Sequence, residues 1–297
     1  MMRLTRARRI ILTVAIALAG VTAAAGSADA APKQAHTTAK GDLYYVTGGY
    51  IARVPVAGGT PQRLVRIGGV SVTGMAVADG RLYWVTQDTR GRLDYITLGK
   101  GIQPAHTLVS GIEFAAGLAT AGGWLYWADE NAIGRVRPGG ESLSRRFVVP
   151  PQETGGGVAN GLATDGRYLY FSRCQDNEIS RVATSGHGAN LRFIRLPAQS
   201  CPQQLAVGND HLYWTVLIGH IGRATLNGQN ASDTWLAIRS GEGPFNVAAD
   251  NASVYWDWGG TAGSPMHIGT ATVSGAHLRT TYLLGQGALL LTAPGAA

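Results

Sequence analysis

Hydrophobic residues alternate with small or polar ones in short runs, and these runs repeat six times along the chain. Each run is centred on a Leu-Tyr-Trp motif or a close variant: Leu43-Tyr44-Tyr45, Leu82-Tyr83-Trp84, Leu125-Tyr126-Trp127, Leu169-Tyr170-Phe171, Leu212-Tyr213-Trp214 and Val254-Tyr255-Trp256. The steps from tyrosine to tyrosine are 39, 43, 44, 43 and 42 residues. Large side chains at alternating positions predict β-strands. A strand-rich repeat of about forty residues predicts a β-propeller with one four-stranded blade per repeat.

Within one repeat, the pattern predicts four antiparallel strands, ordered from the central axis outward. In the second repeat they span residues 74–78, 81–86, 93–98 and 106–109. Pairs such as Asp79-Gly80 and Asn209-Asp210 follow the inner strand and favour tight hairpin turns. The third strand carries a recurring Ile-Gly-Arg motif, as in Ile133-Gly134-Arg135. Because the arginine recurs with the repeat, we expect it to make a shared structural contact.

The two ends of the repeated region predict how the ring closes. Asp42 opens directly on a Tyr-containing strand with no inner strand before it, and residues 287–293 resemble an inner strand without a blade. We therefore expect residues 287–293 to pair with the first blade and remove its exposed edge. The predicted fold is an all-β, six-bladed propeller over residues 42–293.

The N-terminal segment predicts export. Residues 1–30 combine four arginines, an apolar run and an Ala-Asp-Ala cleavage site, as in a secretory signal peptide, and residues 31–41 read as a flexible leader. An uncleaved membrane anchor is the alternative, but the apolar run is short. Cleavage leaves 21 basic and 17 acidic residues (25 − 4 and 18 − 1), a net charge of +4. The remaining charge favours no nucleic-acid role. We expect a secreted or extracytoplasmic monomer that does not bind the membrane after signal cleavage.

Cys174 and Cys201 are the two cysteines of the chain. An exported protein passes through an oxidising compartment, which favours their pairing. Two cysteines alone would leave a metal site short of ligands. The sequence therefore predicts one disulfide bond.

The repeated motifs resemble two groups of known propellers. Leu125-Tyr126-Trp127-Ala128-Asp129 followed by Ile133-Gly134-Arg135-Val136 resembles the YWTD repeat of low-density-lipoprotein-receptor-type propellers, over about residues 42–293. The Ile-Gly-Arg-Val element is also similar to repeats of virginiamycin B lyase and, more distantly, of gluconolactonases. The first resemblance implies a binding propeller. The second implies an enzyme that uses a divalent cation and a histidine or carboxylate base.

Two kinds of connection lie on the same face of a propeller. One joins the second strand to the third within a blade, and the other joins the outer strand of one blade to the inner strand of the next. Near the channel mouth on that face we expect amides, including Asn160, Gln203, Gln204 and Asn246, to outnumber carboxylates. Such a set is a poor cage for calcium or magnesium. The sequence therefore predicts no metal and no cofactor, with a divalent cation as the less favoured alternative.

Two functional hypotheses follow for this face. The favoured one is non-catalytic binding of an extracellular protein, glycan or small molecule. Its candidate ligand-binding residues are Trp258, Phe245, Asn246, Arg173 and Asp129. The alternative is a metal-assisted lyase or lactone hydrolase, with His220, His267 or Glu178 as the general base.

Overall fold

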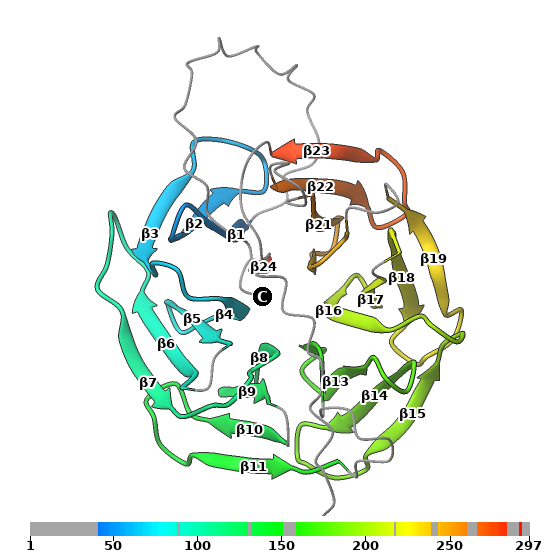
Figure 1. Cartoon of the computed structure of the whole chain (residues 1–297), viewed down its shortest axis with the longest axis horizontal. Helices are drawn as coiled ribbons and strands as arrows, with labels where there is room; N and C mark the ends of the chain where they lie inside the picture. The colour runs from blue at the N-terminus through cyan, green and yellow to red at the C-terminus, as the bar shows by residue number, and fades with distance from the viewer. Residues whose placement is uncertain are drawn as a thin grey trace, which may run out of the picture. The chain divides into compact units, whose positions relative to one another are not determined.

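The computed structural model describes residues 41–87, 90–129, 132–150, 159–216, 218–238, 243–259, 266–283 and 291–292. Within these ranges the chain forms six four-stranded antiparallel sheets and no helix. Figure 1 shows the sheets arranged around a central axis as the blades of a ring. The predicted six-bladed, all-β propeller is therefore confirmed. The predicted signal peptide and nearly all of the leader lie outside the described residues and stay predictions.

Each blade contains an inner, a second, a third and an outer strand. Blades one to three consist of β24 (Leu291–Thr292), β1 (Asp42–Thr47), β2 (Tyr50–Pro55) and β3 (Gln62–Arg66); β4 (Val72–Ala78), β5 (Arg81–Thr86), β6 (Arg92–Thr97) and β7 (His106–Ser110); and β8 (Gly117–Ala121), β9 (Trp124–Ala128), β10 (Ile133–Val136) and β11 (Ser144–Val148). Blades four to six consist of β12 (Leu162–Thr164), β13 (Tyr168–Arg173), β14 (Glu178–Ala183) and β15 (Asn190–Arg195); β16 (Pro202–Gly208), β17 (His211–Val216), β18 (His220–Thr225) and β19 (Ser232–Ala237); and β20 (Val247–Ala249), β21 (Ser253–Gly259), β22 (Met266–Thr272) and β23 (Arg279–Leu283). The strands predicted for the second repeat agree with β4 to β7 within two residues.

The ring closes through the C-terminal strand. β24 pairs antiparallel with β1, with Leu291 opposite Tyr44 and Thr292 opposite Leu43. The predicted closure is therefore confirmed at residues 291–292, and residues 287–290 and 293 lie outside the described residues. The first blade thus takes its inner strand from the opposite end of the chain, so that each of the six sheets has four strands.

The core lies between neighbouring blades and is built from the repeated aromatic residues. The tryptophans of the Leu-Tyr-Trp motifs, including Trp127 and Trp214, are fully buried. In blades three and five the indole lies over a glycine of the adjacent third strand: a Cβ on Gly134 would lie 2.2 Å from Trp127, and one on Gly222 would lie 2.1 Å from Trp214. The Ile-Gly-Arg motif therefore needs glycine because an indole occupies the space of a side chain.

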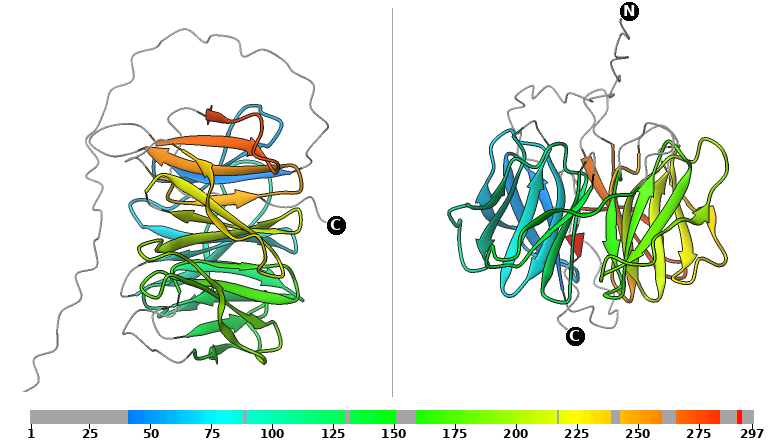
Figure 2. Two further views of the ribbon diagram at one scale, coloured as in Figure 1. Left: turned by 90° about the vertical axis from the view of Figure 1, so that its right-hand side faces the viewer. Right: turned by 90° about the horizontal axis from the view of Figure 1, so that it is seen from below.

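The two rims of the ring differ in which connections they carry. We call the rim with the inner-to-second and third-to-outer connections the turn face, and the opposite rim, with the second-to-third and blade-to-blade connections, the loop face. Figure 2 shows the strands running between the two rims. On the turn face, the outer-strand Phe147 and Phe193 pack on turn glycines of the next blade, where a Cβ on Gly186 or Gly228 would lie 2.9 Å from the ring.

Hydrogen bonds reinforce these turn-face contacts between blades. The Tyr126 hydroxyl donates to the Thr184 carbonyl of the next blade at 3.2 Å, and Tyr170 donates to that of Leu226 at 3.4 Å. Burial raises the pKa of both tyrosines, and Asp165 raises that of Tyr170 further, so both hydroxyls stay donors into alkaline solution.

The recurring arginine of the third strand belongs to the same turn-face contacts. The Arg135 guanidinium lies between Trp124 and Phe147, 4.1 and 3.7 Å from the ring centres, and Arg181 lies 4.0 Å from that of Phe193. The expected shared structural contact is therefore confirmed in blades three and four.

The described part of the chain contains no helix that is both long enough and apolar enough to cross a lipid bilayer.

Candidate functional site

The channel mouth on the loop face is shaped by glycines in three successive blades. Gly74, Gly117 and Gly161 occupy the same register on or just before their inner strands, directly before Met75, Leu118 and Leu162. A Cβ on any of them would lie 2.5 to 2.7 Å from backbone atoms of the following blade. Glycine is therefore required for the close approach of the inner strands around the channel.

Gln204 replaces glycine at this register in blade five. Leu205 pairs with Trp214 as Leu118 pairs with Trp127, so Gln204 is equivalent to Gly117. Its side-chain nitrogen Nε2 lies 3.4 Å from the carbonyl oxygen of Thr73 and 3.2 Å from those of Ala116 and Asn160. One side chain thus reaches across the mouth to three blades.

Behind Gln204 lies the central cavity, with a volume of about 230 Å³. The described residues that line it come from the inner strands of blades two to six and carry no charge. They are mainly alanine, leucine, valine and threonine.

A carboxylate completes the mouth in blade six. Asp257 on β21 is fully buried, and its oxygens accept hydrogen bonds from the backbone nitrogens of Phe245 and Asn246 at 3.2 and 2.7 Å. The Asn246 side-chain amide donates to the same carboxylate at 2.6 Å. Phe245 and Asn246, both predicted ligand-binding residues, therefore lie at the channel mouth, where Asp257 fixes their backbone.

A disulfide bond joins two loop-face segments beside the mouth. Cys174 follows β13 of blade four, and Cys201 immediately precedes β16 of blade five. The backbone nitrogen of Cys201 donates to the Asn177 side chain at 3.0 Å, and the Gln203 amide contacts the Cys201 sulfur. The predicted pairing is confirmed, and it connects two blades next to the candidate site.

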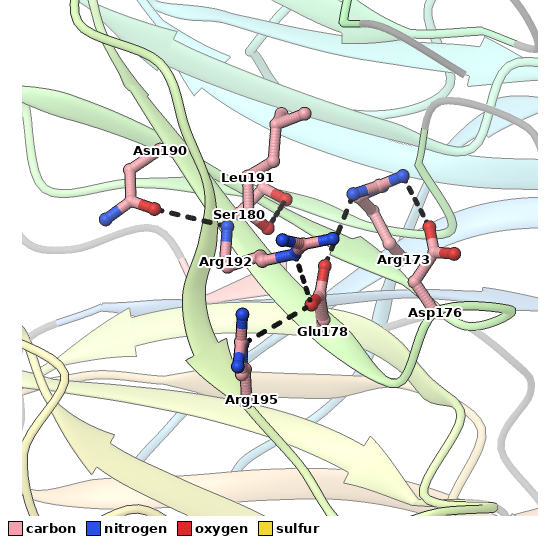
Figure 3. A network of polar contacts seen from close by, with 8 residues as sticks. All are labelled: Arg173, Asp176, Glu178, Ser180, Asn190, Leu191, Arg192 and Arg195. Atoms are coloured by element: carbon pink, nitrogen blue, oxygen red, sulfur yellow. Dashed lines mark hydrogen bonds and ion pairs between the residues drawn. The ribbon is translucent and has the colours of Figure 1, made fainter. Parts of the chain in front are cut away.

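Arg173 and Glu178 belong to one ion-pair network on the loop face of blade four (Figure 3). Arg173 is 6% exposed and pairs with both Asp176 and Glu178. Glu178 also faces Arg192 and Arg195, at 3.4 and 3.9 Å. The guanidinium expected to bind a ligand is thus paired within the protein, and the carboxylate proposed as a base is surrounded by three guanidinium groups. Sequence reasoning missed Arg192 and Arg195, because nothing in the repeat marks them.

The two candidate histidines lie at the loop-face ends of the third strands in blades five and six. His220 begins β18, and His267 is the second residue of β22. Their Nδ1 atoms are buried and have no hydrogen-bond partner among the described residues. The Trp258 ring packs on His267, with ring centres 4.7 Å apart, and its indole nitrogen donates to the Thr280 carbonyl. Trp258 is therefore committed to packing and is only 6% exposed.

Asp129 lies apart from the channel mouth residues, in a hollow of about 180 Å³. The hollow is lined by Gly111, Glu113, Asp129, Ala132, Arg145 and Arg146. One carboxylate oxygen of Asp129 accepts the backbone N–H of Ala132 at 2.9 Å. No contact in the structure tests whether the predicted ligand-binding or catalytic residues have those roles, so the roles stay predictions.

The described polar groups at the mouth are hydrogen-bonded to one another. The central position between three carbonyl oxygens is filled by the Gln204 amide, and the one carboxylate described there already accepts three N–H groups. Within the described ranges, no three histidine, cysteine, aspartate or glutamate side chains are grouped as metal ligands would be.

Comparison with known proteins supports the fold and leaves the chemistry open. Neither a family model nor a curated protein matches the chain. Among solved structures, one from a nidogen/laminin complex is 15% identical with a TM-score of 0.69, covering 85% of this chain and 98% of that one. A PQQ-bound aldose sugar dehydrogenase from Streptomyces coelicolor is 18% identical with a TM-score of 0.54, over 73% and 84% of the two chains.

A gluconolactonase from Xanthomonas campestris is also 18% identical, with a TM-score of 0.55 over 72% of this chain and 77% of its own. At these identities the similarity concerns the fold alone. The chain is thus similar in architecture both to a propeller found in a protein complex and to propeller enzymes.

Proposed function

We propose that this protein is exported through a signal peptide at residues 1–30 and acts outside the cytoplasm as a non-catalytic binding protein. Its loop face holds an extracellular protein, glycan or small molecule. The observation that carries this proposal is the disulfide between Cys174 and Cys201, which fixes two loop-face segments beside the channel mouth. Segments fixed before binding lose less conformational entropy when a ligand arrives. A disulfide also suits an oxidising, extracytoplasmic compartment.

The contacts of the candidate catalytic groups favour binding over catalysis. A general base needs a side chain that is free to take a proton from the substrate. Glu178 instead faces three guanidinium groups, at 3.3, 3.4 and 3.9 Å. The fold similarity to a propeller from a nidogen/laminin complex makes a protein the first ligand to test.

Exposed aliphatic side chains on both rims provide a matched test. Ile218 and Val149 lie on the loop face and are 65% and 48% exposed, whereas Ile102 and Leu143 lie on the turn face and are 56% and 45% exposed. Immobilised residues 31–297 are used to capture proteins and glycans from extracellular medium. We expect the double substitution of Ile218 and Val149 by aspartate to abolish capture. The same substitution of Ile102 and Leu143 should leave it unchanged, and the opposite pattern would contradict the proposal.

A metal-assisted lyase or lactone hydrolase is the second candidate function. It is supported by the gluconolactonase fold similarity and by the buried Nδ1 atoms of His220 and His267, which have no partner among the described residues. Calorimetric titration with Mg²⁺ and Ca²⁺ separates the two candidates. Tight binding of either ion would favour the enzyme, whereas no heat of binding together with loop-face capture would favour the binding protein.

A further inference from the structure

Three backbone carbonyl oxygens converge on one point at the channel mouth, and the side chain there is an imperfect partner for them. The oxygens belong to Thr73, Ala116 and Asn160, and all three face Nε2 of Gln204. A carboxamide nitrogen carries two hydrogens, so it cannot donate fully to three acceptors. The distances of 3.2 to 3.4 Å exceed the usual N–H···O distance of about 2.9 Å.

A primary ammonium group matches this set of acceptors better than the amide does. It carries three N–H donors, no acceptor and a positive charge. Carbonyl oxygens carry partial negative charge, and three of them converge on this point. The guanidinium of Arg173, on the loop face of blade four, is paired with Asp176 and Glu178. Three converging carbonyl dipoles, with no positive charge among the described lining residues of the cavity, therefore favour a cation at this point.

The cavity provides the space that the exchange requires. Gln204 lines the 230 Å³ volume, whose other described lining residues are uncharged and mostly small. The side chain can rotate from the mouth into this space and leave the three carbonyl oxygens free. Its own Oε1 accepts no hydrogen bond from the residues that the structure describes, so no bond to that atom opposes the rotation.

We propose that the channel mouth is a recognition site for a primary ammonium group, which displaces the Gln204 amide and donates to the carbonyl oxygens of Thr73, Ala116 and Asn160. The ammonium belongs either to a lysine side chain of a protein partner or to a free amine. This inference rests on the proposed function of the loop face and names the chemistry of the group that it binds.

n-Butylammonium, which has the carbon chain length of a lysine side chain, is the first probe. Calorimetry on residues 31–297 should show one site, and Gln204→Ala should bind at least about tenfold more tightly because no side chain has to be displaced. Butyltrimethylammonium has the charge but no N–H donor, so it should bind the Gln204→Ala variant at least about tenfold more weakly. Equal affinity for both ions, or binding of K⁺ or Ca²⁺ in place of the amine, would overturn the proposal.

A second measurement does not depend on added ligand. In Gln204→Lys the ammonium is supplied by the chain itself, whereas Gln204→Met has a similar length and no donor. We expect Gln204→Lys to melt at a higher temperature than Gln204→Met and to bind no butylammonium. If the lysine variant melts at or below the methionine variant, the mouth does not accept an ammonium group.

Experiments on the captured ligand distinguish a lysine side chain from a free amine as the source of the ammonium group. Acetylation of a protein partner's lysines, which removes their charge, should abolish capture, whereas competition by spermidine alone indicates a free amine. Capture that depends on Ile218 and Val149 but not on Gln204 or on any amine would leave the loop-face function standing and refute the ammonium site. Butylammonium binding without any captured ligand would support the ammonium site and count against the proposed function.

Discussion

The two rims of the propeller are built on different principles. On the turn face, the same contact recurs from blade to blade: Phe147 packs on Gly186, Phe193 packs on Gly228, and buried tyrosine hydroxyls reach carbonyl groups of the next blade. On the loop face, the repeat is interrupted. Gln204 replaces a glycine, a disulfide joins blades four and five, and an ion-pair network surrounds Glu178.

The two rims therefore separate contacts that hold the blades together from features that occur in a single blade. A contact that recurs in several blades is explained by a property that all blades share, namely packing on the next blade. A feature found in one blade cannot be explained by the repeat, so it is the better candidate for function. The loop face carries such features next to the channel mouth, and three experiments test how far the two rims are independent.

The largest expected effect is on the loop face. Replacing Cys174 and Cys201 by serine removes a cross-link between residues 27 positions apart. Loop-closure entropy predicts a loss of about 3–4 kcal/mol in the free energy of unfolding, measured by urea denaturation. Wild-type protein treated with dithiothreitol is the control and should match the variant. An unchanged unfolding midpoint in both would show that the loop face does not depend on this bond.

A pair of glycine substitutions compares the rims directly. Gly228 on the turn face and Gly68 on the loop face both have positive φ, 87° and 65°. A Cβ on Gly228 would meet Phe193 at 2.9 Å, whereas one on Gly68 meets no atom within 4 Å. Gly68→Ala should therefore cost about 1 kcal/mol from backbone strain, and Gly228→Ala about 2–3 kcal/mol because overpacking is added. Equal losses would argue against the turn-face packing.

The smallest expected effect is a loss of stability above pH 10, which is caused by the turn-face tyrosines. Burial raises the pKa of Tyr126 and Tyr170 in the folded protein above 10.0, the value expected in the unfolded chain. Their contribution to stability is therefore complete below pH 10 and is lost as the pH rises through the folded-state pKa values. Melting temperatures should fall progressively above pH 10. Tyr126→Phe should reduce the slope, and an identical slope would contradict the assignment.

The regular half of this molecule could be predicted from the sequence, because repetition makes a register visible. Alternating large residues located the strands, and the leftover segment at residues 287–293 indicated the closure that β24 makes with β1. The irregular half depends on side-chain contacts that no pattern specifies. Arg173 reads as a free loop-face guanidinium until the Cys174–Glu178 turn brings Asp176 and Glu178 against it.

Two residues at the site illustrate the same limit. Trp258 is a candidate ligand-binding residue because the sequence places it on the loop face, but it packs on His267 and donates to Thr280 across β22 and β23. Gln204 left a usable signal, since alignment of the repeats places it opposite glycines in blades two to four. That its amide reaches three blades follows only from the closeness of the inner strands.

Amide hydrogen exchange with and without the captured ligand tests the central claim most directly. Peptides covering the loop-face connections at residues 66–72 and 196–202 should gain protection when the ligand is bound. Peptides covering the turn-face connections at residues 78–81 and 208–211 should exchange at the same rate in both samples. Protection confined to the turn-face peptides would contradict the assignment of binding to the loop face.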